Sequence, residues 1–267
     1  MKNIFEYAKC CLQQTDIEQK LHLTIEAYQL QQQQHLSFHN QIPVESIELT
    51  RFPERPLLLY PREMPKRKLN QKQGIAALFH ALAHIEWMAI YLAWDIIFRF
   101  RDLPQAFYQD WLTVAYQEAQ HFDLIRQHLR QFNLEYGDLP AHAGLWEHAQ
   151  KTANHLLARL ALVPRCMEAR GLDVTPTMID KFMALEDQKS VDILTQILND
   201  EIGHVAIGSY WFTYFCQQQQ LEPEMTYQQL LQQFYKGRPK GPFNYRLRQL
   251  AGFSMSEIQW LENYQHQ

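Results

Sequence analysis

Hydrophobic residues occupy almost every position of the stretch from Ile75 to Phe98. A helix that is apolar on all sides is buried at the centre of a protein. We therefore predict a central helix over about 74–101. After a short link at Pro104, a second amphipathic helix is predicted over about 105–132. A link this short makes the two helices antiparallel neighbours.

A longer connection over 133–145 leads to the third predicted helix, over about 146–170. Pro164 is expected to kink this helix, because proline has no backbone N–H to donate. Gly171 is expected to end it, since glycine is the usual residue after a helix terminus.

A new helix start is predicted just after that point. Thr175 is a suitable cap, and Pro176 would occupy the first helical position. An unbroken helix from there to the end of the apolar pattern would be improbably long. We therefore predict a break near 186–188 and a fourth core helix that ends near Gln218.

Segments outside these four helices are predicted to pack on them in one structural unit. Two amphipathic helices fill residues 1–36, with Thr15 as the expected cap of the second. Five prolines make 37–72 an irregular strap. The predicted parts of the chain are 1–72 for the N-terminal helices and strap, 73–218 for the four-helix bundle, and 219–267 for short helices around 226–235, 243–250 and 255–264.

Composition supports a helical protein and excludes several function classes. Of 267 residues, only nine are glycine and twelve are proline, which favours an all-α fold over a sheet with many turns. The formal net charge of −4 argues against extensive contact with nucleic-acid backbone. Four cysteines without Cys-x-x-Cys spacing indicate a reduced, cytoplasmic protein.

The sequence predicts neither a secretory signal nor a membrane span. The first residues are charged and contain no apolar core of a signal peptide. The central helix is long enough to cross a bilayer, but it contains Glu86 and Asp95, which would be costly at membrane depth. We therefore expect a protein without a membrane partner.

Two pairs of side chains carry the candidate chemistry. Glu118 and His121 are three residues apart, and Glu201 and His204 repeat that spacing. Residues three apart leave the same face of a helix, one turn from each other. Buried Glu and His side chains are costly unless they are paired or bind a metal, so each pair predicts two ligands for one ion.

Two further glutamates complete the pattern. Glu86 precedes Glu118 by 32 residues, and Glu168 precedes Glu201 by 33. The matching intervals indicate an internal duplication in which each half supplies a Glu and a Glu-x-x-His. Four carboxylates and two histidines in a four-helix bundle form a di-iron or di-manganese site. This oxygen and nitrogen ligand set suits iron or manganese better than metals that prefer sulfur.

The motifs resemble those of the ferritin-like di-iron carboxylate superfamily. Within it, the runs MEARGLDVTP and NDEIGHVAIG look like those of an uncharacterised bacterial family, and the resemblance covers about 74–218. It implies a ferritin-like four-helix bundle with additional terminal helices. It also implies that Asp200 orients the ring of His121. Gln117 stands where the first half would carry the matching Asp, so the partner of His204 stays open.

Other polar residues have simpler interpretations beside functional ones. His80 and His84 are expected to be packed or to support the ligands rather than to bind metal themselves. A basic loop near the C-terminus is by default a solvated loop. Its alternative role is a phosphate or substrate rim, since Lys and Arg suit phosphate. That rim would consist of Lys236, Arg238, Lys240 and Arg246.

We therefore predict a cytoplasmic oxidoreductase with two divalent metal ions, iron or alternatively manganese. It would activate dioxygen or peroxide to oxidise or hydroxylate a small-molecule or nucleotide-like substrate, with an electron-donor protein as a further partner. A second hypothesis is a tRNA-modifying hydroxylase that binds RNA, because distant similarity to such enzymes exists in the superfamily. A third is a bundle for metal storage, peroxide scavenging or structure, whose carboxylates share protons without metal. We expect a monomer or a small homo-oligomer.

Overall fold

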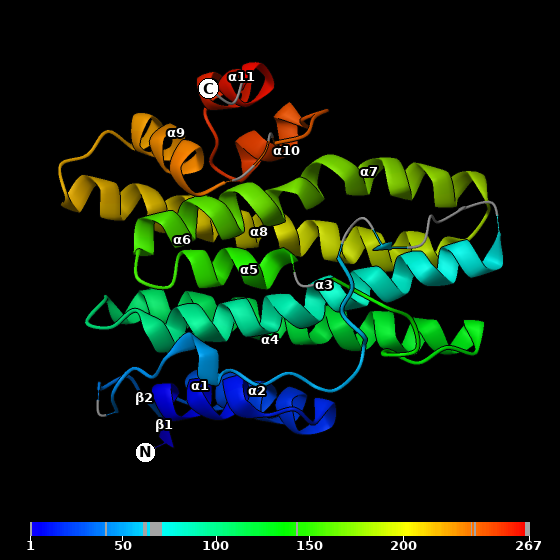
Figure 1. Ribbon diagram of the computed structural model, residues 1–267, viewed down its shortest axis with the longest axis horizontal. Coiled ribbons are helices and arrows are strands. Elements are labelled where there is room, and N and C mark those ends of the chain that lie inside the picture. Colours follow the sequence, from blue (N-terminus) through cyan, green and yellow to red (C-terminus); the bar gives the residue numbers. More distant parts are fainter. Residues whose placement is uncertain are drawn as a thin grey trace. The chain divides into compact units, whose positions relative to one another are not determined.

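The computed structural model describes residues 2–40, 42–60, 63–64, 71–142, 144–235, 237 and 239–264. Helices make up nearly all of its regular structure (Figure 1), so the predicted all-α class is confirmed. The chain forms two compact units, Met1–Glu147 and His148–Gln267. The three-part division expected from the sequence stays a prediction.

An antiparallel pair of long helices forms the centre of the first unit. Helix α3 covers Lys72–Arg99 and helix α4 covers Gln105–Leu129, and the two lie side by side (Figure 1). The hydroxyl of Tyr108 closes the turn between them, because it accepts a hydrogen bond from the Leu103 N–H and donates one to the Phe100 carbonyl. Both helices and their short link were predicted from the sequence.

Helix α3 is the one described helix that is long and apolar enough to cross a membrane by length and composition. In its most apolar window, 67% of the residues are buried within the protein. Burial of this extent is expected of the core helix of a soluble protein.

Two shorter helices, α1 (Ile4–Gln13) and α2 (Ile17–Gln32), pack against this pair. The predicted cap Thr15 is wrong: Asp16 caps α2, and its carboxylate accepts a hydrogen bond of 2.8 Å from the Gln19 N–H. A carboxylate at this position also interacts favourably with the helix dipole. Strands β1 (Lys2–Asn3) and β2 (Leu36–Ser37) form a short parallel pair. Two-residue strands are too short to be recognised in a sequence.

The predicted strap is largely irregular in its described part. A single 3-10 turn, η1, covers Ile47–Leu49. Two hydrogen bonds to the backbone of Arg51 hold the strap to the helices. The Arg51 N–H donates to the Leu12 carbonyl, and the Tyr91 hydroxyl donates to the Arg51 carbonyl at 2.8 Å. Further along, Leu58 forms an isolated bridge with Ala141.

The predicted single helix over 146–170 is wrong. Helix α5 (Gly144–Lys151) stops, and α6 (Leu156–Leu162) begins after His155, whose ring nitrogen accepts from the Ala158 N–H. A π-helical segment, η4 (Val163–Glu168), follows directly. Pro164 lies in that segment, where its missing N–H widens the helix into a π turn rather than ending it.

The predicted helix boundary at Gly171 and Thr175 is also wrong. Helix α7 runs from Ala169 to Ala184 and contains Gly171 and Pro176 in its interior. Leu172 and Phe182 are buried along it, and burial of an apolar face outweighs local propensity.

The break predicted near 186–188 is confirmed. Helix α8 (Gln188–Gln218) starts after Asp187, whose carboxylate accepts from the Ser190 N–H at 3.1 Å.

Three helices form the C-terminal arm, as predicted: α9 (Pro223–Phe234), α10 (Tyr245–Leu250) and α11 (Met255–Asn263). The capping box of Ser254 and Glu257 is present at the start of α11. Two buried ion pairs fasten this arm to the rest of the unit, Arg248 with Asp173 at 2.8 Å and Arg165 with Glu257 at 2.7 Å.

Two glycines of helix α8 offer a matched test of the packing in the second unit. A Cβ atom on Gly208 would lie 2.5 Å from the Cβ atom of Pro164, whereas a Cβ atom on Gly203 would meet nothing within 4 Å. We expect Gly208→Ala to destabilise the protein by about 1–3 kcal/mol through overpacking. Gly203→Ala should instead stabilise it by up to about 1 kcal/mol through helix propensity. Urea unfolding followed by circular dichroism measures both, and equal effects would contradict the close contact.

Candidate metal centre

Three predicted ligands come together in the first unit. Glu86 lies in the middle of α3, and Glu118 and His121 lie on the facing stretch of α4. Each offers a ligand atom, and these atoms lie within 4.8 Å of one another. Glu86 and Glu118 are at about equal distances along the chain from the turn between the helices, so two antiparallel helices place them at the same height.

The distances within this cluster fit ligands of a shared cation. Nδ1 of His121 lies 3.4 Å from Oε2 of Glu86 and 3.6 Å from Oε2 of Glu118. Ligand atoms that each lie about 2.1 Å from one ion are roughly 3–3.5 Å from each other. Bulk water does not reach these side chains, because Glu86, Glu118 and His121 are only 4%, 0% and 0% exposed.

Burial makes this cluster electrostatically costly without a cation. Burial raises the pKa of Glu86 well above its ordinary value, the neighbouring Glu118 carboxylate raises it further, and His121 lowers it. Two carboxylates in a dry site must share a proton or face a positive charge. A divalent ion would supply that charge, so this cluster of two carboxylates and one imidazole could hold a metal ion.

The second unit carries the matching set of side chains. Nδ1 of His204 lies 3.8 Å from Oε1 of Glu201, one turn away on α8. His204 is buried, and Glu201 and Glu168 are half-buried. Glu168 is the last residue of the π-helical segment η4. π turns inside helices are frequently found at functional sites.

The contact between Gly208 and Pro164 sets the register of Glu168 against α8. The segment containing Pro164 and Glu168 packs against α8, and α7 and α8 are joined by a short turn. Because the two helices are antiparallel, the residue one turn after Pro164 lies level with the residue one turn before Gly208. These residues are Glu168 and His204, so they lie at similar heights along the helix pair.

Asp200 and Gln117 are both half-buried. The pairing of Asp200 with His121 would join residues of the two units and stays a prediction. The same holds for the partner of His204.

His80 and His84 are supporting residues, as the sequence interpretation favours. Nε2 of His80 accepts hydrogen bonds from the N–H groups of Gly137 and Leu139, at 3.0 and 3.4 Å. His84 contacts the Tyr136 hydroxyl at 2.9 Å and the His142 carbonyl at 3.2 Å. Both histidines therefore fasten the connection between α4 and α5 to helix α3.

The predicted phosphate rim is only partly described. Lys240 and Arg246 are exposed, whereas Lys236 and Arg238 lie outside the described residues. Lys240 lines a surface hollow together with Glu262, and a carboxylate there disfavours phosphate. Arg248, from the same basic stretch, is buried and paired with Asp173, so it is a structural residue and takes no part in a rim.

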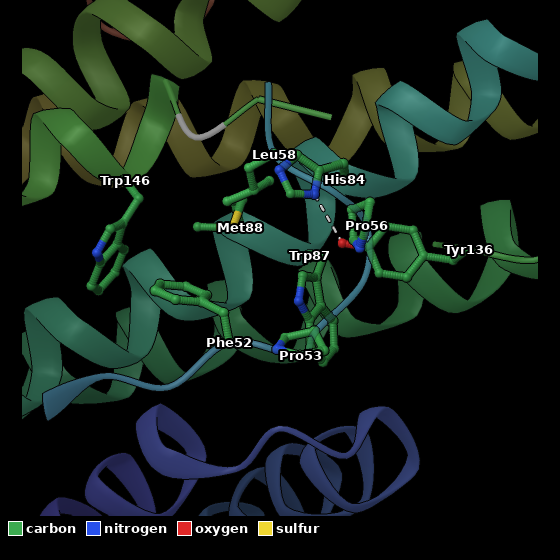
Figure 2. Close-up of a pocket in the computed structure, with 9 residues that line it drawn as sticks. All are labelled: Phe52, Pro53, Pro56, Leu58, His84, Trp87, Met88, Tyr136 and Trp146. Carbon is green, nitrogen blue, oxygen red and sulfur yellow. Dashed lines mark hydrogen bonds between the residues drawn. The ribbon is translucent and has the colours of Figure 1, made fainter. Parts of the chain in front are cut away.

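The sequence interpretation missed two features of the first unit. Lys20 is completely buried on α2, although lysine on an amphipathic helix is usually solvated. An apolar pocket also lies beside Trp87 on α3 (Figure 2). Neither feature has a sequence signal, because both depend on how the N-terminal helices and the strap cover α3.

Comparison with known proteins identifies relatives but no activity. A family model described as "Protein of unknown function (DUF455)" matches residues 13–259. An uncharacterized protein of Haemophilus influenzae is 44% identical over 217 residues, which cover 79% of this chain and 75% of that protein. No solved structure matches the chain.

Proposed function

Since the chain belongs to the DUF455 family of proteins of unknown function, we propose its function from the residues themselves: it is a di-metal oxidoreductase of ferritin-like type. The observation that carries the proposal is the buried cluster of Glu86, Glu118 and His121, whose ligand atoms lie within 4.8 Å of one another. The uncharacterized relative from Haemophilus influenzae neither supports nor opposes an activity.

We further propose that the second set of side chains contributes to the same di-metal site. Its support is the duplicated pattern: each half of the chain supplies one Glu and one Glu-x-x-His, and each Glu-x-x-His brings its imidazole Nδ1 within 4 Å of a carboxylate oxygen. The second set consists of Glu168, Glu201 and His204.

The roles of the residues follow from their chemistry. The glutamates would hold two divalent ions, and each histidine would supply one nitrogen ligand. When bound, the two ions would supply the electrons and Lewis acidity needed to activate dioxygen or peroxide. Burial of Glu86 and Glu118 keeps bulk water from the ligands, so that the bound ions would be reached only by small molecules. A cytoplasmic location, iron rather than manganese, and an electron-donor protein remain part of the proposal.

Metal stoichiometry tests the proposal directly. Protein reconstituted with ferrous iron under anaerobic conditions and freed of excess metal is expected to retain about two ions per chain. Glu118→Ala should lower retention at least tenfold, because it removes a buried ligand from the site. The exposed residue Glu147 provides the matched control, and Glu147→Ala should retain the metal of the unaltered protein.

Retention of fewer than one ion per chain by the unaltered protein would refute the proposal. Equal retention by Glu118→Ala would refute it as well, provided that circular dichroism shows both proteins folded. Glu201→Ala tests the contribution of the second unit: retention of two ions by that variant would limit the site to the first set.

A further inference from the structure

We propose that the pocket under the strap of the first unit binds a small, neutral, ring-containing molecule that carries one hydrogen-bond acceptor. The pocket lies between helix α3, the strap, and the segments that carry Tyr136 and Trp146 (Figure 2). It is a second binding site, and it does not depend on the proposed metal chemistry.

Helix geometry separates this pocket from the metal ligands. The pocket-lining residues of α3 include His84, Trp87 and Met88, which form one stripe at helical spacing. Glu86 lies about 150° around the helix from the centre of that stripe. A molecule in the pocket is thus separated from Glu86 by the body of helix α3, and it contacts the strap instead.

The walls of the pocket are mainly aromatic. The Phe52 and Trp146 rings meet edge to face with their centroids 5.3 Å apart, and the Trp87 and Tyr136 centroids are 6.2 Å apart. Met88 also lines the pocket, and thioether sulfur packs favourably against aromatic rings. Flat, polarisable walls of this kind favour a planar ring over a compact polar group.

One hydrogen-bond donor in this wall has nothing to donate to. Trp87 is 1% exposed, and its indole nitrogen has no hydrogen-bond partner among the residues that the structure describes. Figure 2 shows this nitrogen on the side of the ring that faces Phe52. A buried indole N–H usually finds an acceptor, and leaving a buried donor unpaired costs about 1–3 kcal/mol. A ligand with a carbonyl or ether oxygen would supply the missing acceptor.

The other polar groups of the pocket are already engaged with each other. Nε2 of His84 lies 3.2 Å from the His142 carbonyl, so it carries the proton, and Nδ1 accepts from the Tyr136 hydroxyl at 2.9 Å (Figure 2). An imidazole that donates from one nitrogen and accepts at the other is the neutral form. Among the described lining residues there is no carboxylate, lysine or arginine. A charged ligand would therefore lose its hydration without gaining a partner.

The size of the pocket limits the ligand. Its cavity volume is about 40 Å³, and the pocket is partly open to solvent. A closed cavity of about 150 Å³ holds one benzene ring, so the pocket takes the acceptor group and one edge of a single ring, and the rest of the molecule lies at the open side. A nucleotide is too large to enter.

Acetophenone and ethylbenzene form a matched pair of probes, because they have similar shapes and only acetophenone has an acceptor oxygen. Binding is followed through the indole N–H signals of the six tryptophans in nitrogen-15 spectra of the full-length protein. Trp87→Phe removes one of these signals and so identifies it. We expect acetophenone to shift the Trp87 signal. It should bind about fivefold more tightly than ethylbenzene, because it makes one additional hydrogen bond.

Four variants test the assignment. Trp87→Phe keeps a ring but lacks the donor, so the preference for acetophenone should disappear. Leu58 lines the pocket and its neighbour Leu57 does not, although both are exposed. We expect Leu58→Trp to weaken acetophenone binding at least tenfold, whereas Leu57→Trp should leave it unchanged. Glu118→Ala should also leave binding unchanged, because the pocket is independent of the metal ligands.

The proposal is overturned if acetophenone at about 10 mM does not shift the Trp87 signal. It is also overturned if ethylbenzene binds more tightly than acetophenone, since an apolar cavity without a donor prefers the more hydrophobic probe. Equal weakening by Leu57→Trp and Leu58→Trp would place the binding site elsewhere on the strap. None of these results bears on metal retention, so this inference and the proposed metal site fail separately.

Discussion

Lys20→Met is expected to stabilise the protein by about 1–4 kcal/mol at pH 7, the range observed when buried charged groups are replaced by apolar ones. Lys20 is completely buried, and its Nζ atom lies 3.0 Å from the centroid of the Tyr91 ring and 5.0 Å from that of Trp87. Nζ has no hydrogen-bond partner among the described residues. Methionine has a similar length and buries no charge.

The pH dependence of this effect identifies its cause. Burial lowers the pKa of Lys20 well below 10.5, so between the folded and unfolded pKa values the unfolded chain binds one more proton than the folded protein. The free energy of unfolding therefore rises with pH in this window, by up to about 1.4 kcal/mol per pH unit. Lys20→Met lacks this contribution, so its advantage over the unaltered protein should be largest at neutral pH and should shrink as the pH approaches 10.

Urea unfolding at several pH values between 6 and 10 measures this difference. Lys181→Met is the matched control, since Lys181 is exposed on helix α7 and its replacement should change stability by less than about 0.5 kcal/mol at each pH. A Lys20→Met variant that is less stable at every pH would show that attraction between the ammonium group and the aromatic rings outweighs the cost of burial.

The helical class and the cluster of Glu86, Glu118 and His121 could be predicted from the sequence for a common reason. The apolar pattern of α3 and the short link before α4 together determine which residues lie at the same height. Glu86 and Glu118 therefore meet because of helix geometry alone, and His121 follows from its spacing to Glu118. Where helices are regular and the turn between them is short, the position of a residue in the sequence determines its height in the helix pair.

The second unit was harder to predict because local signals there conflict with packing. Gly171, Thr175 and Pro176 resemble a helix end followed by a new start, yet α7 runs through all three. Pro164 was expected to kink a helix and instead lies in a π turn that ends at Glu168. Local preferences of this kind amount to about 1–3 kcal/mol, which burial of an apolar helix face can exceed.

The pocket and Lys20 show a different limit of sequence reasoning. Trp87 and Tyr91 lie in the apolar helix that the sequence predicts to be buried, and both are buried. Burial alone does not show that the Trp87 N–H lacks an acceptor. That property depends on where the strap places Phe52 and on the segment that carries Tyr136. Proline-rich segments have no periodic pattern, so their contacts can be found only from the folded structure.

The ion pair of Asp173 and Arg248 leads to the second large expected effect, because it carries the contact of helix α10 with α7. Oδ1 of Asp173 accepts from Nε of Arg248 and from the Asn244 N–H, both at 2.9 Å, and Oδ2 accepts from a terminal nitrogen of Arg248 at 2.8 Å. Both side chains are almost completely buried. Removing one partner of such a pair leaves an uncompensated buried charge.

Asp173→Ala is therefore expected to lower the free energy of unfolding by about 3–5 kcal/mol, measured by urea unfolding at pH 7. The double variant Asp173→Ala with Arg248→Met should recover much of this loss, since it removes the unpaired guanidinium as well as the carboxylate. Arg246→Met is the control, because Arg246 is exposed two residues away on α10 and should contribute less than about 0.5 kcal/mol. A loss below about 1 kcal/mol in Asp173→Ala, or no recovery in the double variant, would show that the Phe243 and Phe253 rings, 4.8 and 5.0 Å from the Arg248 guanidinium, hold the arm without the ion pair.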